Sequence, residues 1–462
     1  MERYDVIVVG AGTAGCVAAM TLASKGFDVC LIDRKDRRAI GDKVCGDAVG
    51  KHHFDALGLP YPSGEEKEGD IVGVKIYSPD RESVFRISGY GLTGFMINRH
   101  LFGQRLLKYA LDAGAVLMDK VHVSAPILKD GSVRGVIASE IRRGEKLEIL
   151  SDVTIDASGV AAVIRRRLPP EIGIEKEISW EDKVVCYREI RQLSGEIEDP
   201  EFCEIYLNLT VAPGGYIWVF PKRNGVVNVG LGVASTPNHP NPKDQLYRYV
   251  LSEPLFEGSS LLHGGGGIVP TRRPIDSLVG GGVVVIGDAA CQVNPIHGGG
   301  IGPSMMGGKI SGEVLSEALD SWEPTPKSLW PINVRFMKGY GKKQAGLDVF
   351  RIFLQGITDE DLNYGMKYAV ITEDDLLKAS MGEPIRLNIE EATRRIFLGL
   401  GRLRLLRSLY KMARTLREAR RLYERYPSSP DEFPRWRMEI RRIFDEAKAS
   451  FWHESTITRR RA

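Results

Sequence analysis

Two carboxylates and a spaced set of glycines in this sequence are suited to binding a dinucleotide. Gly10-x-Gly12-x-x-Gly15 directly follows the apolar run 6–9. In such a motif the first glycine permits a tight turn, the second lets backbone approach a pyrophosphate, and the third lets the next helix pack on the strand. Asp33 ends a second apolar run, 18 residues after Gly15, where a carboxylate accepts hydrogen bonds from ribose hydroxyls. An acidic residue there favours an unphosphorylated ribose, so FAD and NAD both fit.

A second group of chemically suited residues lies late in the chain. Asp288 follows the apolar run 283–286, and the turn Gly298-Gly299-Gly300 leads into a run of small residues over 304–317 that predicts a helix. We expect Asp288 to bind the ribityl chain of FAD. The helix N-terminus would then face the flavin pyrimidine, where its N–H groups stabilise an anionic reduced flavin.

Parallel strands and helices must position these residues. Apolar runs predict strands over 4–9, 27–33, 153–156 and 283–286, and we expect a helix to begin at Arg99. Strand patterns with turn signals occupy 70–90 and 180–235, and the chain after residue 313 is mostly helical in pattern. Alternating strands and helices of this kind predict an α/β nucleotide-binding unit.

Composition excludes several classes of protein. The chain has 462 residues, 43% hydrophobic and 27% charged, with a net charge of +3, which fits a soluble globular protein without general affinity for nucleic acid. Its six cysteines show no CxxC spacing, so we expect no metal site, no disulfide scaffold and a reducing, cytoplasmic location. No apolar run is long enough to span a bilayer. We therefore expect at most a peripheral contact with the inner face of the cell membrane.

The C-terminal segment is strongly basic. Residues 391–462 have a net charge of +10, whereas the rest of the chain has −7, and apolar residues recur at helical spacing between 398 and 410. One interpretation is an amphipathic helix that packs on the body with its basic face in solvent. The other is a helix face that lies on anionic lipid headgroups.

The order of these motifs resembles a known fold. Gly10-x-Gly12-x-x-Gly15, Asp33, Arg99, Asp156-Ala-Ser-Gly159, Gly287-Asp288 and Pro295-x-x-Gly-Gly-Gly300 are similar to the p-hydroxybenzoate-hydroxylase-type FAD fold. The resemblance implies an α/β protein with a Rossmann-type FAD-binding domain, a β-rich substrate domain and a helical C-terminal region. The boundaries we predict are 1–60, 95–165 and 270–330 for the first, 61–94 and 166–269 for the second, and 331–462 for the third.

Two further motifs resemble one family on this fold. Lys43-Val-Cys-Gly-Asp47, and Tyr216-x-Trp218-x-Phe220-Pro221 followed by Gly230-x-Gly232, are similar to the signatures of the geranylgeranyl reductase family, which includes archaeal digeranylgeranylglycerophospholipid reductases. The resemblance implies an FAD-dependent enzyme that reduces isolated C=C bonds of geranylgeranyl chains, with a hydride from flavin N5 and a proton. Besides the motif glycines Gly10, Gly12 and Gly15, it implies FAD contacts at Ala14, Asp33, Cys45, Gly46, Ala48, Arg99, Val123, Asp288, Gly300 and Ile301.

The substrate and the electron donor are less constrained. Asn and Gln together make up only 16 of 462 residues, which is typical of heat-adapted proteins and favours an archaeal ether phospholipid precursor, with geranylgeranyl diphosphate as another isoprenoid substrate. No second GxGxxG is present, so the donor is external: NADPH, ferredoxin or another reductant fits.

The aromatic motif has two interpretations. Tyr216, Trp218 and Phe220 alternate, so on a strand they share one face, either as packed core or as a wall beside the substrate. Such a wall would stabilise positive charge at the tertiary carbon of an alkene and exclude water. The proton could come from Cys45, His297, Tyr216 or ordered water, and each of these side chains also has a purely structural interpretation. His52 and His53 are expected on a helix surface without metal-binding partners.

Two other functions share this fold. A flavin-dependent monooxygenase or halogenase is one alternative, because the aromatic motif is also similar to the halogenases' Trp-x-Trp-x-Ile-Pro. An electron-transfer flavoprotein that passes electrons to a membrane quinone is the other. Its relatives have a C-terminal cluster of four cysteines, whereas no cysteine follows Cys291 here, which weighs against it.

Overall fold

A mostly parallel sheet forms the base of the molecule. The computed structural model describes residues 2–89, 91–321, 324–370, 372–375, 377 and 400–459. The sheet has the order β17-β18-β11-β1-β2-β8, and the β9–β10 hairpin extends it from β11. Its strands are β1 (Glu2–Val9), β2 (Val29–Ile32), β8 (Val116–Met118), β9 (Val121–Lys129), β10 (Ser132–Glu140), β11 (Lys146–Asp156), β17 (Val279–Gly280) and β18 (Val283–Val285). The four predicted strands all lie in this sheet, and they pair in parallel.

Helices cover the sheet, as its apolar strands require. Val6, Ile7 and Val8 in β1 are fully buried, because a parallel strand packed on both faces needs a continuous apolar run. The covering helices are α1 (Thr13–Ala23), α3 (Arg99–Asp112) and α5 (Ile301–Ser321), so the expectation that a helix begins at Arg99 is confirmed. Helices α1 and α5 lie very close: a Cβ on Gly308 would lie only 2.4 Å from the Ala14 carbonyl oxygen.

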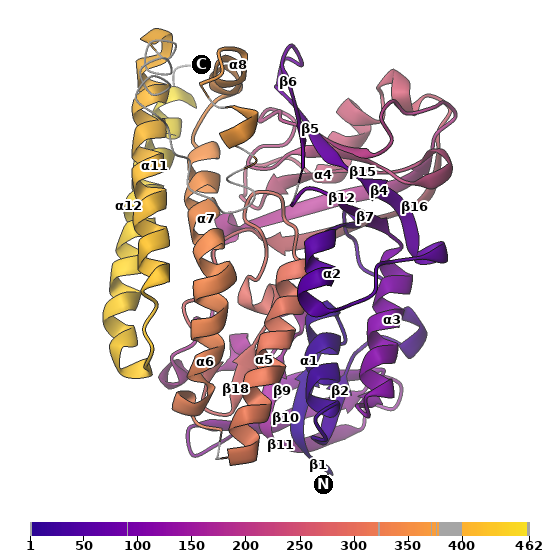
Figure 1. The fold of residues 1–462 in the computed structure, drawn as a ribbon, viewed down its shortest axis with the longest axis vertical. Helices are drawn as coiled ribbons and strands as arrows, with labels where there is room; N and C mark the ends of the chain where they lie inside the picture. Colours follow the sequence, from indigo (N-terminus) through magenta and orange to yellow (C-terminus); the bar gives the residue numbers. More distant parts are fainter. Residues whose placement is uncertain are drawn as a thin grey trace.

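A second, antiparallel-rich sheet lies beside the first (Figure 1). Its order is β16-β12-β15-β14-β13-β5-β6. Its strands are β5 (Gly73–Tyr77), β6 (Val84–Ser88), β12 (Lys183–Gln192), β13 (Phe202–Tyr206), β14 (Ile217–Pro221), β15 (Val226–Ala234) and β16 (Ser260–Pro270). The strand-rich regions predicted from the sequence are therefore confirmed.

A small sheet crosses the predicted domain boundary. It has the order β3-β7-β4, and its strands are β3 (Ala48–Gly50), β4 (Lys67–Ile71) and β7 (Gly94–Ile97). Strand β3 and the helix after it, α2 (Lys51–Leu57), lie in the segment assigned to the FAD-binding domain, whereas β4 lies in the segment assigned to the substrate domain. The two units share hydrogen bonds here, and the boundaries themselves stay a prediction.

Helices make up most of the described C-terminal part. They are α6 (Pro326–Phe336), the π-helical turn η11 (Met337–Gly341), α7 (Lys342–Leu354), α8 (Asp359–Lys367), α11 (Leu403–Glu424) and α12 (Phe433–Arg459). Helices α11 and α12 run side by side along one edge of the molecule and pack on α7 (Figure 1). Helix α11 buries Leu405, Met412 and Tyr423, so the packed amphipathic helix is confirmed for this part; residues 398–399 lie outside the described residues.

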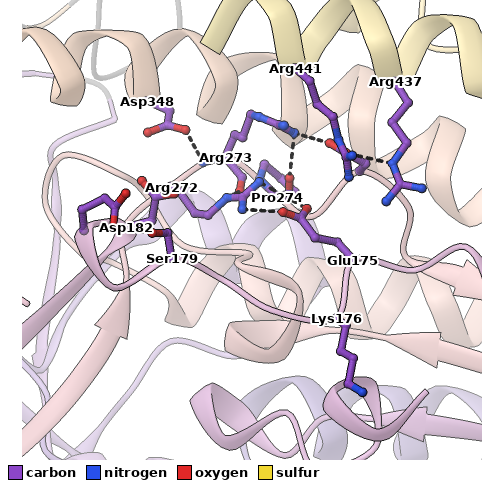
Figure 2. Close-up of polar contacts among 12 residues, drawn as sticks. Glu175, Lys176, Ser179, Asp182, Arg272, Arg273, Pro274, Asp348, Arg437 and Arg441 are labelled. Atoms are coloured by element: carbon purple, nitrogen blue, oxygen red, sulfur yellow. Dashed lines mark hydrogen bonds and ion pairs between the residues drawn. The ribbon is translucent and has the colours of Figure 1, made fainter. Parts of the chain in front are cut away.

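Buried ion pairs attach these helices to the sheets (Figure 2). Asp276, 1% exposed at its side chain, accepts from Arg273 and from Arg437 and Arg441 of α12. A second buried carboxylate, Asp182, pairs in the same way with guanidinium and ammonium groups of α7 and α12. We call these contacts the arginine–carboxylate network. They join four segments that are distant in sequence, so the C-terminal helices are held by charge as well as by apolar packing.

Candidate active site

The first glycine loop forms a cradle between β1 and α1. Gly10 has φ +105°, and a Cβ there would lie 2.5 Å from the Ala157 carbonyl oxygen. A Cβ on Gly15 would lie 1.9 Å from the Gly10 carbonyl oxygen, so both positions exclude a side chain. Gly12 differs, since nothing lies within 4 Å of its Cβ position. It N-caps α1 without a side-chain hydrogen bond, which leaves the first N–H groups of the helix for an anion such as a pyrophosphate.

Asp33 closes the cradle at the end of β2. Its carboxylate accepts hydrogen bonds from the backbone N–H groups of Ala11 and Lys35, both at 2.8 Å. The Asp33 carbonyl oxygen accepts from the N–H of Val121, two residues before the buried Val123 of β9. Ala14 lies in the first turn of α1, buried against Gly287. The structure thus brings Asp33 and the start of β9 together, and Ala14 lies in the helix that follows β1.

Arg99 provides the strongest test of whether a dinucleotide fits. It is the first residue of α3 and is only 7% exposed, yet its Nε and Nη1 atoms have no hydrogen-bond partner within the described part of the chain. A buried guanidinium without partners is costly unless an acceptor completes it. Together with the open face at Gly12, these donors fit the phosphate and carbonyl oxygens of a bound dinucleotide.

The loop over residues 43–47 joins the two large sheets. The Lys43 ammonium pairs with Asp288 at 2.7 Å, and Val44 packs on Gly265 of β16. The Cys45 carbonyl oxygen accepts from the side-chain amide of Asn228 at 2.8 Å. A Cβ on Gly46 would lie 3.1 Å from the Phe220 ring, so this glycine lets the loop approach β14, which we call the aromatic strand. Ala48 follows as the exposed first residue of β3.

Asp288 lies in the turn after β18, beside the second glycine loop. A Cβ on Gly300 would lie 3.2 Å from Asp288 Oδ1, and Ile301 begins α5. The structure thus brings Asp288, Gly300 and Ile301 together, as the sequence predicted. Their contact with the flavin stays a prediction, and the ion pair between Lys43 and Asp288 is a feature that the motif did not suggest.

Three aromatic rings line up along β14. The centroids of Tyr216 and Trp218 are 5.9 Å apart, and those of Trp218 and Phe220 are 6.3 Å apart. Met96 and Ile71 complete the apolar cluster around them. Gly230 lies opposite Trp218 on β15, where a Cβ would lie 2.5 Å from the indole ring. This contact gives a physical reason for the glycine in the paired motif, and the shared face of the rings is confirmed.

A polar network behind the aromatic strand was not predicted from the sequence. Asn228 accepts from the Trp218 indole N–H at 3.0 Å and donates to Asp47 at 2.9 Å. The Lys222 ammonium pairs with the same Asp47 carboxylate at 2.8 Å. Asp47 is 2% exposed and has φ +62°, uncommon for a residue other than glycine. The sequence signal was Asn228, a lone amide in the apolar run 226–234.

The surroundings of the three candidate proton donors shift their pKa values in different directions. Burial, with the neighbouring charge of Asp47, raises the pKa of the Cys45 thiol. Burial also raises the pKa of Tyr216, whose hydroxyl donates to the His297 carbonyl oxygen at 2.7 Å. Burial, with the charge of Lys343, lowers the pKa of His297 to about 4. The His297 Nδ1 atom accepts from the N–H of Gly299 at 3.1 Å, so the ring is neutral near pH 7.

His52 and His53 correct one expectation. Both are half-buried rather than on a helix surface, and burial lowers the pKa of His53 to about 3. The His53 ring packs against Gly302 at the start of α5 and against Tyr340, which the spacing of α2 alone does not reveal. In the described ranges no group of three or more His, Cys, Asp or Glu side chains is arranged to hold a metal ion. Over the same ranges no helix is both long and apolar enough to cross a membrane.

Known proteins are similar to this chain in sequence and in fold. Residues 182–269 match the geranylgeranyl reductase catalytic domain, and residues 5–59 match glucose inhibited division protein A. A structure from Thermoplasma acidophilum described as geranylgeranyl bacteriochlorophyll reductase-like aligns with TM-score 0.75 and 23% identity over 89% of this chain and all of that one. A myxobacterial chondrochloren halogenase aligns with TM-score 0.65 and 17% identity over 92% of this chain and 98% of that one, which shows the fold alone.

A relative from Sulfolobus acidocaldarius is similar over almost the whole sequence. This digeranylgeranylglycerophospholipid reductase is 40% identical over 97% of this chain and 99% of its own length. The chain therefore belongs to the digeranylgeranylglycerophospholipid reductase family.

Proposed function

We propose that this protein is an FAD-dependent oxidoreductase that reduces isolated C=C bonds in the geranylgeranyl chains of isoprenoid lipids. The observation that supports it most is the loop over 43–47, which places Cys45 between the second glycine loop and the aromatic strand. Membership of the reductase family supports the same reaction. A nucleotide site and an apolar site are thus held together by one short segment.

FAD would be held by the residues around the first sheet. Gly10, Gly12 and Gly15 form the cradle, Asp33 would accept from the ribose, and Arg99 would donate to oxygen atoms of the dinucleotide. When bound and reduced, FAD supplies the hydride from N5. Asp288, together with Gly300 and Ile301 at the start of α5, would hold the flavin end. Ala14, Cys45, Gly46, Ala48 and Val123 complete the proposed contacts.

The aromatic strand prepares the alkene for an otherwise difficult reaction. An isolated alkene accepts hydride poorly, so positive charge must develop at its tertiary carbon as a proton arrives. The faces of Tyr216, Trp218 and Phe220 stabilise such charge by roughly 0.5–2 kcal/mol per ring. The apolar cluster around them excludes water that would trap the charged carbon.

Among the candidate proton donors, the side-chain environments favour Cys45. Its thiol keeps its proton at neutral pH, because burial and Asp47 both raise its pKa. His297 is neutral, with Nδ1 already accepting a hydrogen bond, and the Tyr216 hydroxyl is engaged by a carbonyl oxygen. Asn228 holds the Cys45 carbonyl oxygen, and the Cys45 thiol accepts a hydrogen bond from the backbone N–H of Asp47 at 3.4 Å.

The family and the sequence indicate the substrate and the kind of electron donor. The relatives' name supports an archaeal ether phospholipid precursor, and geranylgeranyl diphosphate has the same chain. Electrons come from an external donor, and both NADPH and ferredoxin are compatible with a single GxGxxG.

The location we propose is cytoplasmic, with peripheral contact at the membrane through the basic C-terminal helices, where Leu403 and Tyr410 of α11 are exposed.

Replacing Trp218 by leucine tests the aromatic wall. Leucine keeps an apolar side chain but removes the ring face, so we expect turnover to fall about 2- to 30-fold while FAD content stays unchanged. Trp218→Phe is the matched control, because it loses the same indole hydrogen bond to Asn228 but keeps a ring. We expect it to remain close to the native rate. Equal losses in both variants would assign the residue a structural role.

A simple assay separates the alternative functions on this fold. Reduced protein exposed to air in the presence of an aromatic acceptor and halide should only reoxidise. Formation of hydroxylated or halogenated product would instead indicate a monooxygenase or halogenase.

A further inference from the structure

One buried amide holds the loop over residues 43–47 from behind. Asn228 of β15 is fully buried, and its side chain makes three hydrogen bonds. Its Nδ2 group donates to the Cys45 carbonyl oxygen at 2.8 Å and to the Asp47 carboxylate at 2.9 Å. Its Oδ1 atom accepts from the Trp218 indole N–H at 3.0 Å. A single side chain thus joins the loop, which carries a candidate proton donor, to the aromatic strand.

Asp47 fixes the end of the same loop. Its backbone carbonyl oxygen accepts from the N–H of Ile97 in β7 at 2.9 Å. Its carboxylate pairs at 2.8 Å with Lys222, whose ammonium also pairs with Glu68 of β4. Together with the bond from β15, these contacts tie the loop to strands of two different sheets.

The conformation of Asp47 is unfavourable by itself. Its φ of +62° lies in the left-handed region, and its Oδ1 atom is buried without a hydrogen-bond partner in the described part of the chain. Both features lower the stability of the fold. Backbone strain of this kind is typical of functional sites, where the surrounding structure holds a group in place. A role beyond stability is therefore the better explanation for this residue.

Asp47 also sets the electrostatic surroundings of the neighbouring thiol. The titratable and charged groups that face Cys45 are Asp47 and Lys43 of the loop, Arg99 of α3, Cys186 of β12 and Tyr216 before β14. Burial and the charge of Asp47 raise the pKa of the thiol, whereas Arg99 and Lys43 lower it. Asp47 is thus the one charged group of this set that keeps the proton on the thiol.

We propose that Asn228 and Asp47 are positioning residues, which hold the loop over 43–47 against the aromatic strand while Cys45 transfers a proton to the alkene. The proposal rests on the proposed function and assigns a role to the network behind the aromatic strand. In the step, the S–H bond of Cys45 breaks and the proton forms a C–H bond on the alkene. The hydride neutralises the other carbon, and water returns a proton to the thiolate.

Replacing Asn228 by leucine tests the positioning role. Leucine has a similar size but loses all three hydrogen bonds, so the loop is no longer fixed to β15. We expect kcat to fall about 10- to 100-fold, while FAD content and KM stay nearly unchanged. Trp218→Phe keeps both bonds from Asn228 to the loop, so its rate should be much closer to the native rate. A native kcat in Asn228→Leu would overturn the proposal.

A second buried asparagine provides the matched control. Asn333 of α6 is also fully buried, but it bonds to Leu278 and Ser277 instead of the loop. We expect Asn333→Leu to lose stability while the folded protein keeps its kcat. If it loses as much kcat as Asn228→Leu does, the effect is a general one and the proposal is wrong.

Replacing Asp47 by asparagine tests the charge and keeps the shape, also if Asn228→Leu does not fold. Without the carboxylate the thiol loses its proton more readily, and an acid catalyst is inactive above its pKa. We expect the basic limb of the kcat–pH profile to move to lower pH. A merely structural residue would lower kcat at every pH alike, and coincident limbs would overturn the role of Asp47.

A measurement without substrate separates this inference from the proposed function. Iodoacetamide alkylates cysteines of the FAD-loaded protein, and peptide mass spectrometry follows each one. We expect Asn228→Leu to speed alkylation of Cys45 about 10- to 100-fold, with the fully buried Cys30 and Cys291 unchanged. An unchanged rate at Cys45, or an equal rise at all three cysteines, would overturn the inference. If Cys45 responds but no lipid is reduced, the proposed function fails while the positioning of the loop stands.

Discussion

Replacing Gly12 by alanine should remove most of the bound FAD while the protein remains folded. No atom lies within 4 Å of the Cβ position, and the backbone there is not in the left-handed region, so the free protein tolerates a methyl group. The same methyl group would point into the space proposed for the pyrophosphate. Overpacking of this kind costs about 1–3 kcal/mol, which corresponds to about 5- to 150-fold weaker FAD binding. Flavin absorbance per protein and titration of the apoprotein with FAD measure the effect.

Two further glycines serve as controls for this prediction. Gly195→Ala also meets no atom within 4 Å but lies away from the cradle, so it should keep full FAD content. Gly15→Ala would place its Cβ 1.9 Å from the Gly10 carbonyl oxygen, so it should lose both FAD and stability. If Gly12→Ala binds FAD as tightly as the native protein, the pyrophosphate does not pass this position and the proposed cradle is wrong.

Replacing Asp276 by asparagine should cause the largest loss of stability. Its carboxylate faces Arg273, Arg437 and Arg441, and the amide would leave these guanidinium groups without a counter-charge. Removing one partner of a buried ion pair costs about 3–5 kcal/mol. We expect this decrease in the free energy of unfolding by chemical denaturation, together with easier proteolysis of the C-terminal helices.

A surface carboxylate on the same helix provides the matched control. Glu439 of α12 pairs with the exposed Arg435 at 3.3 Å, so Glu439→Gln should cost less than about 1 kcal/mol. Similar costs for Asp276→Asn and Glu439→Gln would show that apolar packing alone holds the helices.

The pH dependence of the Asp276 contribution can also be stated. Burial alone would raise the pKa of Asp276, but Arg273 and Arg272 outweigh it and hold this pKa well below the usual range. The stabilisation is therefore fully present above the ordinary aspartate pKa of about 4 and is lost as the pH falls toward the folded-state pKa of about 2. As the pH falls through this window, the native protein and Asp276→Asn should become more similar in stability.

The sequence was sufficient to predict the parallel sheet because its strands are continuous apolar runs. Residues 6–9 and 153–156 are buried in the sheet, as short apolar runs bounded by turn residues predict. The spacing of Gly10, Gly12 and Gly15 likewise predicted a turn that only glycine permits at two of its three positions. These local signals do not depend on distant contacts.

Contacts between distant segments were not predictable in the same way. The pairing of Lys43 with Asp288 and that of Asp47 with Lys222 join residues more than 170 positions apart. The half-buried state of His53 depends on Gly302 and Tyr340, which belong to other helices. Charged side chains on such segments look like ordinary surface residues until the fold brings them together. The lone Asn228 was the one local sign of the network behind Trp218.

The central claim is tested most directly by the mass of the product. FAD-loaded protein is reduced with dithionite without oxygen, incubated with digeranylgeranylglycerophosphate and analysed by mass spectrometry, with unreduced protein as the control. The account predicts mass gains in steps of two hydrogens that require reduced flavin. An unchanged lipid in the presence of fully reduced, FAD-loaded protein would contradict it.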